Sequence, residues 1–220
     1  MEIKVMKNVL ENNDKTAQKN RKKFQDGEIL TVNLMGSPGA GKTSLLEVSL
    51  EMLKKSINPA VIEGDLSTAK DAQRIAAHGV PVIQINTGGG CHLDAQMIDK
   101  VLPGFNMREI DLMVIENVGN LICPVDFDLG EDVRVVVLSI AEGEDKPVKY
   151  PRTFMEADAV IINKVDLAPY CDVNLEGLIA QIKNLNPQTK IFCVSCREKK
   201  GIEPWVSWLT GQVQDKKSHA

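Results

Sequence analysis

Short apolar runs alternate with longer amphipathic segments along most of the chain. Runs rich in Val, Ile and Leu predict buried strands over residues 29–36, 59–65, 80–86, 111–118, 133–141, 157–164 and 189–195. Apolar positions at helical spacing predict helices over residues 42–56, 67–78, 92–101, 174–185 and 202–210. Because such strands are buried on both faces and the helices connect them, we predict an α/β fold with a doubly wound, mostly parallel sheet. Ligands of this fold bind at the carboxyl ends of the strands.

Residues 1–26 carry a charged helical pattern and contain no strand of their own. We therefore expect an N-terminal helical extension over residues 1–26 and one domain over residues 27–220. The 220-residue chain is 43% hydrophobic and 25% charged, which is ordinary for a soluble protein with a sizeable core.

The charge and the apolar content narrow the classes of partner. A net charge of -4 argues against a general nucleic-acid binder, which would present a surplus of basic residues. The basic start of the chain has no long apolar run behind it, and the other apolar stretches are shorter than a membrane span. We expect a cytoplasmic protein with neither a nucleic-acid nor a membrane partner.

A glycine-rich segment between the first strand and the first long helix is the strongest motif. Residues 36–43, GSPGAGKT, match the phosphate-binding pattern G-x-x-x-x-G-K-[ST] of P-loop NTPases. In that pattern the backbone N–H groups surround the phosphates, Lys42 reaches the outer phosphates and Thr43 is a ligand of Mg²⁺. The predicted nucleotide-binding residues here are Gly36, Ser37, Gly39, Ala40, Gly41, Lys42, Thr43 and Ser44.

A second motif specifies the base. Asn163-Lys164-Val165-Asp166 follows a predicted strand and resembles the N-K-x-D motif of GTPases. The Asp166 carboxylate can accept hydrogen bonds from guanine N1–H and its exocyclic amine, whereas adenine would leave it unpaired, so the motif favours GTP over ATP. Ser195 and Cys196 follow the last strand, where GTPases place a loop whose backbone contacts the base, and we predict a backbone contact here.

Acidic residues at the ends of two strands are the candidates for magnesium. Asp65 ends the second predicted strand and Glu116 lies at the end of the fourth, and together with Thr43 they offer the oxygen ligands that Mg²⁺ prefers. Glu116-Asn117-Val118-Gly119 resembles the D-x-x-G element of GTPases, in which the glycine N–H senses the γ-phosphate. Asn120 stands where Ras-type enzymes carry a water-positioning Gln, so we expect slow hydrolysis.

The adjacent pair Cys91-His92 follows the third strand, and Cys123 follows the sensor glycine. Thiolate and imidazole ligands suit zinc, nickel or copper, and three of them leave one position open for exchange. The alternative is a histidine at a helix start beside a buried cysteine. Cys193 and Cys196 form a C-x-x-C pair without a second pair, and Cys171 lies in a loop, so we interpret these three as structural thiols.

These segments occur in a fixed order: GSPGAGKTS, EGD, TGGGCHL, ENVGNLICP and NKVD. Over residues 25–212 the chain resembles the nickel-insertion GTPases of hydrogenase maturation, the HypB family. The resemblance implies a SIMIBI-type GTPase fold, Mg²⁺-dependent hydrolysis of GTP to GDP, nucleotide-dependent homodimers, and a nickel or zinc site of Cys91, His92 and Cys123 near the two-fold axis.

The resemblance also implies that Lys149 lies in the segment that contacts nucleotide across the dimer interface. The implied partners are the hydrogenase large subunit and a companion nickel-insertion protein. Many members begin with a cysteine-rich or histidine-rich segment that binds nickel, whereas this chain has neither residue type before His78.

Two other functions remain open. A related metallochaperone GTPase, for urease or for a cobalamin-dependent enzyme, would share the phosphate and guanine motifs, although Cys91-His92 with NLICP favours the hydrogenase type. A non-enzymatic metal-buffering protein would leave the nucleotide motifs without a role.

Overall fold

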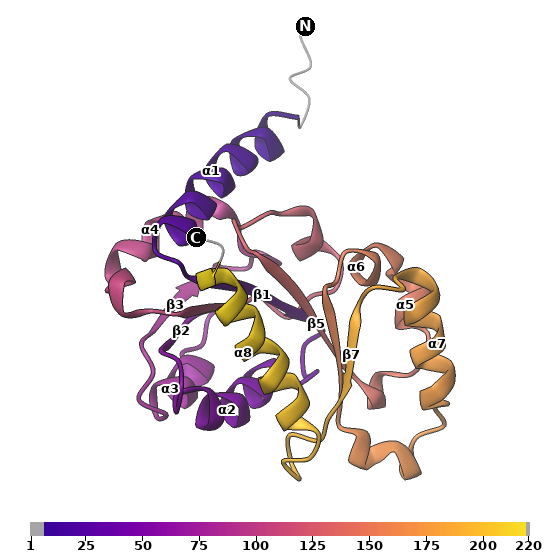
Figure 1. Cartoon of the computed structure of the whole chain (residues 1–220). Coiled ribbons are helices and arrows are strands. Elements are labelled where there is room, and N and C mark those ends of the chain that lie inside the picture. Colours follow the sequence, from indigo (N-terminus) through magenta and orange to yellow (C-terminus); the bar gives the residue numbers. More distant parts are fainter. Residues whose placement is uncertain (1–6, 219–220) are drawn as a thin grey trace, which may run out of the picture.

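A seven-stranded parallel sheet forms the centre of the molecule. The computed structural model describes residues 7–218, so residues 1–6 of the expected extension and residues 219–220 lie outside the described part. The strand order is β3-β2-β4-β1-β5-β6-β7 (Figure 1). The strands are β1 (Leu30–Gly36), β2 (Pro59–Asp65), β3 (Val82–Asn86), β4 (Leu112–Glu116), β5 (Val133–Ser139), β6 (Ala159–Asn163) and β7 (Lys190–Cys193). The predicted α/β fold with a parallel sheet is confirmed, and each strand lies within its predicted range.

Helices connect and cover the strands. They are α1 (Lys7–Asp26), α2 (Lys42–Leu53), α3 (Lys70–Ala76), α4 (Ala95–Val101), α5 (Lys146–Lys149), α6 (Pro151–Met155), α7 (Leu175–Leu185) and α8 (Ile202–Ser218). Short 3-10 turns lie at η1 (Leu102–Gly104), η2 (Met107–Glu109), η3 (Cys123–Asp126), η4 (Ile140–Glu142) and η5 (Val165–Tyr170).

Several predicted helix limits were wrong. α4 begins at Ala95 rather than at residue 92, because the Asp94 side chain caps it by accepting from the Met97 N–H at 2.8 Å. α3 begins late because the chain after Asp65 first makes a turn around that carboxylate. α8 continues past its predicted end to Ser218. The short helices α5 and α6 were not predicted, since so few residues show no helical period.

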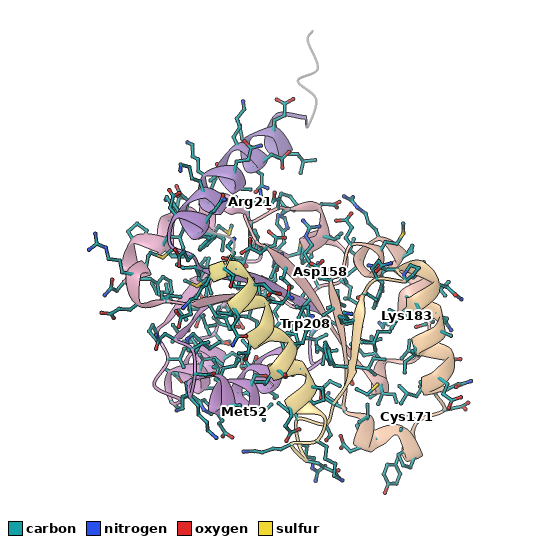
Figure 2. All side chains as sticks on the ribbon, viewed as in Figure 1. Arg21, Met52, Asp158, Cys171, Lys183 and Trp208 are labelled. Carbon is teal, nitrogen blue, oxygen red and sulfur yellow. The ribbon has the colours of Figure 1, made fainter. Side chains whose placement is uncertain are left out.

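The two faces of the sheet are covered by different helices, as a doubly wound sheet requires. Side chains of α2, α3 and α8 pack on one face against alternate strand residues such as Val32 and Leu34. Met52 on α2 and Trp208 on α8, both labelled in Figure 2, pack against this cluster. The opposite face carries α1 and α4 at one end of the sheet and α6 and α7 at the other.

Helix α1 is attached to the rest of the molecule from Asn13 onward, where the Asn13 side chain donates to the Asp128 carbonyl and accepts from the Ala95 N–H. Phe24 is fully buried among apolar side chains of the sheet and α4, and the Asn20 amide donates to the Ala95 and Leu129 carbonyls at 2.8 and 3.2 Å. Arg21, labelled in Figure 2, makes a two-pronged ion pair with Asp128. Figure 1 shows α1 beside α4 with its N-terminal end projecting away from the sheet.

The apolar stretches in the described helices are short or interrupted by charge. Between residues 7 and 218, no helix has the length and apolar character needed to span a bilayer.

Candidate functional site

The phosphate-loop motif lies at the carboxyl end of β1, with α2 starting at Lys42. Gly39 and Gly41 have φ values of 76° and 97°, which favour glycine. A Cβ atom at Gly41 would lie 2.3 Å from Nδ2 of Asn163, so a larger residue would displace the base motif. Lys42 Nζ donates to the Gly36 carbonyl at 3.2 Å, which places the ammonium group inside the loop.

A cavity of about 420 Å³ opens above this loop. It is lined by the phosphate loop and by the ends of β2 and β4: Pro38, Gly39, Gly41, Lys42, Thr43, Ser44, Glu63, Gly64, Asp65, Leu66, Asp71, Arg74, Glu116, Asn117, Val118, Gly119 and Lys164. The cavity thus brings together the predicted magnesium-binding residues and five of the predicted phosphate-binding residues, Gly39, Gly41, Lys42, Thr43 and Ser44; Gly36, Ser37 and Ala40 do not line it.

The candidate magnesium ligands differ in their surroundings. Thr43 Oγ1 donates to Glu116 Oε1 at 2.8 Å, so these two side chains meet at the cavity floor. The Asp65 carboxylate accepts from the Ser67 and Thr68 N–H groups at 2.8 and 2.9 Å. Burial acts to raise the pKa of Asp65, but its hydrogen bonds outweigh burial and lower that pKa. Asp65 therefore offers an ionised carboxylate at the cavity wall, held by its own turn.

Glu63 is a site residue that the sequence analysis missed. It lies opposite Glu116 in the β2–β4 register, and the two side chains are only 2% and 3% exposed. Burial, followed by the charge of Glu116 and a hydrogen bond with it, raises the pKa of Glu63 to about 10; burial also raises the pKa of Glu116. The available signal was its spacing, since residues 63 and 65 share one face of a strand.

The donor set at this floor fits a divalent cation. One oxygen of each of Glu63 and Glu116, Oε2, is buried without a hydrogen-bond donor among the described residues. Hard oxygen atoms of two carboxyl groups and the Thr43 hydroxyl are the ligand type that Mg²⁺ prefers.

Arg74 on α3 is a second lining residue that the sequence analysis did not single out. Its guanidinium pairs with Glu47 and Asp71 and donates to Ser44 Oγ at 3.0 Å. A hydrogen bond with Glu47 is the main cause that raises the pKa of Arg74. Arg74 therefore places a permanent positive charge beside the phosphate loop.

The predicted γ-phosphate sensor lies against the phosphate loop. A Cβ atom at Gly119 would lie 2.9 Å from Cα of Pro38, so the close approach requires glycine. The next residue, Asn120, donates its N–H to the Gly36 carbonyl at 3.0 Å.

A second cavity, of about 350 Å³, continues from the first. Its lining is Gly41, Ser44, Glu47, Val48, Asn163, Lys164, Asp166, Leu167, Cys196 and Arg197. Asp166 Oδ1 is buried and has no hydrogen-bond partner in the described part of the chain. Asn163 Nδ2 donates to the Ala40 carbonyl at 3.0 Å, and Lys164 Nζ donates to the Gly39 carbonyl at 2.7 Å, so the base motif is fastened to the phosphate loop.

The other three residues predicted to contact the nucleotide, Ser195, Cys196 and Lys149, lie in different parts of the structure. Ser195 is buried, exchanges two backbone hydrogen bonds with Lys200, and thereby orders the base loop. Cys196 lines the second cavity, and burial raises the pKa of its thiol to about 11. Lys149 lies outside both cavities of its own chain, where it pairs with Asp145 and lines a groove with Leu121 and Ile122.

Cys91, His92 and Cys123 come together at the carboxyl edge of the sheet. Their candidate ligand atoms all lie within 4.8 Å of one another, and Cys91 Sγ lies 3.5 Å from His92 Nδ1. The His92 ring stacks on Phe127 with centroids 3.7 Å apart. Burial lowers the pKa of His92 despite nearby acids, which favours the neutral imidazole that metals require. We refer to these three residues as the Cys/His cluster.

The two thiols of the Cys/His cluster, Cys91 and Cys123, interact with each other. A hydrogen bond with Cys91, followed by burial, raises the pKa of Cys123, while a hydrogen bond from Asn120 acts to lower it. Cys171 and Cys193 take no part in the cluster, and Cys193 ends β7, where burial raises the pKa of its thiol.

Comparison with known proteins gives a consistent set of relatives. The family model described as CobW/HypB/UreG, nucleotide-binding domain, matches residues 30–193. The hydrogenase maturation factor HypB of Escherichia coli K12 is 48% identical over 210 residues, covering 96% of this chain and 72% of the relative. The probable hydrogenase maturation factor HypB of Methanocaldococcus jannaschii is 38% identical over 215 residues, covering 98% and 97%.

Solved structures show the same likeness. HypB from Archaeoglobus fulgidus has a TM-score of 0.86 at 41% identity and covers 92% of this chain and 98% of its own. HypB from Helicobacter pylori, solved in complex with nickel, has a TM-score of 0.87 at 36% identity and covers 93% and 96%. A LAO/AO transport system kinase, at 17% identity and a TM-score of 0.54, shares the fold.

Proposed function

The chain belongs to the CobW/HypB/UreG family and, within it, to the HypB hydrogenase maturation factors, which are P-loop GTPases; on this premise we propose that it is a GTP-driven switch that carries nickel for insertion into hydrogenase. One observation carries the proposal. The Cys/His cluster is assembled from the loop after β3 and the loop after β4, and the second of these passes through Gly119, the predicted γ-phosphate sensor, before it reaches Cys123.

GTP is the proposed nucleotide because of the unpaired oxygen at Asp166. A buried carboxylate oxygen without a partner is costly, and guanine N1–H and the exocyclic amine would satisfy it, whereas adenine has no matching donors. Asn163 and Lys164 already hold the phosphate loop, so the base and phosphate cavities are fixed relative to each other.

Within the phosphate cavity we assign roles by chemistry. Lys42 and the loop N–H groups would offset the charge of the phosphates, and Gly119 would donate to the γ-phosphate. Thr43, Asp65 and Glu116, joined by Glu63, would hold Mg²⁺, which supplies charge stabilisation at the phosphates when it is bound. Asn120 carries hydrogen bonds to neighbouring loops and offers no water-positioning group like that of Ras-type enzymes, so we expect slow hydrolysis.

Nickel is the proposed cargo of the Cys/His cluster, and zinc is the alternative occupant. Two thiols and one imidazole are borderline-soft ligands that both metals accept, and they leave a coordination position open for transfer. The Helicobacter pylori relative was solved with nickel, which favours that metal here. A cytoplasmic location fits this chemistry, because thiolate ligands require reduced cysteines.

A nucleotide-dependent homodimer is the proposed working form. Ile122, beside the cluster, is 57% exposed, and Val148, beside Lys149, is 70% exposed. We propose that a second subunit covers these two exposed apolar side chains. A two-fold partner seated here would bring its Lys149 toward the first subunit's nucleotide and its cluster toward the first cluster. The hydrogenase large subunit and a companion nickel-insertion protein are the proposed recipients and helpers.

The test combines sedimentation with nickel titration at fixed pH, first with GDP and then with a non-hydrolysable GTP analogue. We expect a larger dimer fraction with the analogue and a nickel affinity that differs between the two states, by reciprocal linkage. Equal dimer fractions and equal affinities in both states would contradict the proposal. A hydrogenase-maturation assay in cells lacking the protein separates it from urease or cobalamin-enzyme chaperones.

A further inference from the structure

Asn120 is connected to the phosphate loop through its main chain. Its N–H donates to the Gly36 carbonyl at 3.0 Å, and the two residues form an isolated antiparallel bridge outside the main sheet. Gly36 is the first residue of the phosphate motif, and its carbonyl also accepts from Lys42. A shift of this loop on binding a γ-phosphate therefore moves the main chain of Asn120 directly.

The Asn120 side chain reaches both loops that form the Cys/His cluster. Oδ1 accepts from the Ile122 N–H at 2.8 Å, which fixes the turn that leads into Cys123. Nδ2 donates to the Cys91 carbonyl at 3.3 Å, across to the loop after β3. One half-buried asparagine thus contacts the phosphate loop, the Cys123 turn and the Cys91 main chain.

The third residue of the Cys/His cluster, His92, is connected to the sheet core through its neighbour Leu93. Asn117, only 1% exposed, accepts from the Leu93 N–H at 3.0 Å and donates to the Asn33 side chain at 3.1 Å. Leu93, the residue after His92, is fully buried in the core. The main chain beside His92 is therefore tied to the sheet core through Leu93 and Asn117. The main chain at Cys91 and at the turn into Cys123 is tied to Asn120 at the edge of the phosphate loop.

We propose that Asn120 is the positioning residue that transmits the nucleotide state to the metal cluster, by moving Cys91 and Cys123 relative to the main chain at Leu93, which the core holds. This proposal rests on the proposed function, since it presumes a metal on the cluster and GTP in the cavity. It also accounts for an asparagine at a position where Ras-type enzymes carry a water-positioning residue: here the side chain is engaged with the neighbouring loops.

Two variants and one matched control test the proposal. Asn120→Ala removes the side-chain hydrogen bonds to Ile122, to the Cys91 carbonyl and to the Cys123 thiol. Asn120→Asp retains an acceptor for Ile122 and loses the amide donor to Cys91 and Cys123. Asn186→Ala is the control, because Asn186 is also half-buried and also ties separate segments, donating to the Met155 and Ala157 carbonyls far from the site. Each protein is titrated with Ni²⁺ in GDP and in the non-hydrolysable GTP analogue, and the nickel–thiolate charge-transfer band is recorded in both states.

The measured quantity is the ratio of nickel affinities between the two nucleotide states. We expect a ratio of about 5- to 150-fold in the unchanged protein and in Asn186→Ala, the usual range of such coupling. In both Asn120 variants we expect a ratio near one and a charge-transfer band that no longer depends on nucleotide, while nickel and GTP still bind.

The possible failures are distinguishable. An Asn120→Ala or Asn120→Asp protein that keeps the full ratio overturns the positioning role and leaves the proposed function intact. A ratio of one in the unchanged protein overturns the proposed switch itself. If Asn186→Ala also brings the ratio of nickel affinities to one, the coupling depends on the general order of the loops. The specific role of Asn120 is then wrong. Thermal melting of each variant confirms that the comparison is made between folded proteins.

Discussion

Glu63 on β2 and Glu116 on β4 lie side by side in the sheet register, and both carboxyl groups are buried at the floor of the phosphate cavity. Two like acids at one buried place cannot both ionise without a cation between them. The nucleotide-free and metal-free protein is therefore destabilised at its own active cavity, which has a measurable pH dependence.

Glu63→Gln should stabilise the metal-free protein at pH 8 and change it little near pH 4.5. The pKa of Glu63 rises from 4.5 to about 10 on folding, because of burial and then Glu116. Between these values the unfolded chain loses a proton that the folded chain keeps, so stability falls as pH rises. A glutamine side chain stays neutral over this pH range in both the folded and the unfolded chain, so the variant lacks this loss of stability. Melting temperatures in EDTA from pH 4.5 to 8 test this, with Glu51→Gln, at the exposed Lys199 pair, as control. A variant less stable at every pH would refute it.

Asp166→Asn should move the nucleotide preference from guanine toward xanthine. The amide can donate to the carbonyl that replaces the guanine amine, and it loses a charged acceptor worth about 1.5–3 kcal/mol, roughly 10- to 150-fold in GTP affinity. Competition binding with GTP, ATP and XTP measures the change. Asp172→Asn, an exposed acid in the chain segment after η5, should leave all three affinities unchanged. Equal GTP and ATP affinity in the unchanged protein would remove the assigned role of Asp166.

Lys42→Ala should lower GTP turnover by about 10²- to 10³-fold, the usual effect of deleting one group that stabilises charge in a transition state. Lys42 is only 7% exposed, and its ammonium group lies within the phosphate loop. Phosphate release under saturating GTP is the assay. Lys54→Ala, at the exposed end of α2, serves as control. Turnover that survives in Lys42→Ala would point to a contaminating enzyme.

Cys91→Ser and Cys123→Ser should each weaken nickel binding by roughly tenfold or more, since even changes outside the ligand set of a metal cost about 10- to 100-fold. Cys171→Ser should bind as the unchanged protein does, because Cys171 takes no part in the cluster. Isothermal titration at a fixed pH is required, as ligand thiols release protons on binding. Unchanged nickel affinity in both variants would mean that Cys91 and His92 are ordinary turn residues and do not bind the metal.

Phe24→Ala should destabilise the whole protein by about 3–5 kcal/mol, the usual cost of emptying a buried phenylalanine site. Phe24 is fully buried among residues of the sheet and α4, whereas Leu10 on the same helix is 43% exposed and Leu10→Ala is the control. Urea unfolding followed by circular dichroism gives both values. A loss below about 0.5 kcal/mol for Phe24→Ala would mean that α1 is separable from the core.

Local pattern was sufficient for the strands and for the two nucleotide motifs. A strand buried on both faces is apolar throughout, so β1, β4 and β6 were recognisable from a few consecutive residues. The phosphate loop was equally recognisable, because its glycines, Lys42 and Thr43 lie within eight consecutive residues and form one local pattern. The short helices α5 and α6 were not predicted from the sequence, because four or five residues show no helical period.

The sequence by itself determined which segments fold into strands, which residues carry the motifs predicted to bind the phosphates and the base, and which residues have the chemistry of metal ligands. Only the tertiary structure decided which of them meet. The placement of β4 between β2 and β1 brings Glu63 to Glu116 and the Cys123 loop to Cys91. The same packing ties Asn120 to Gly36 and Phe24 to the core. These contacts join residues far apart in the chain, and strand order and register, which local sequence does not encode, set their distances.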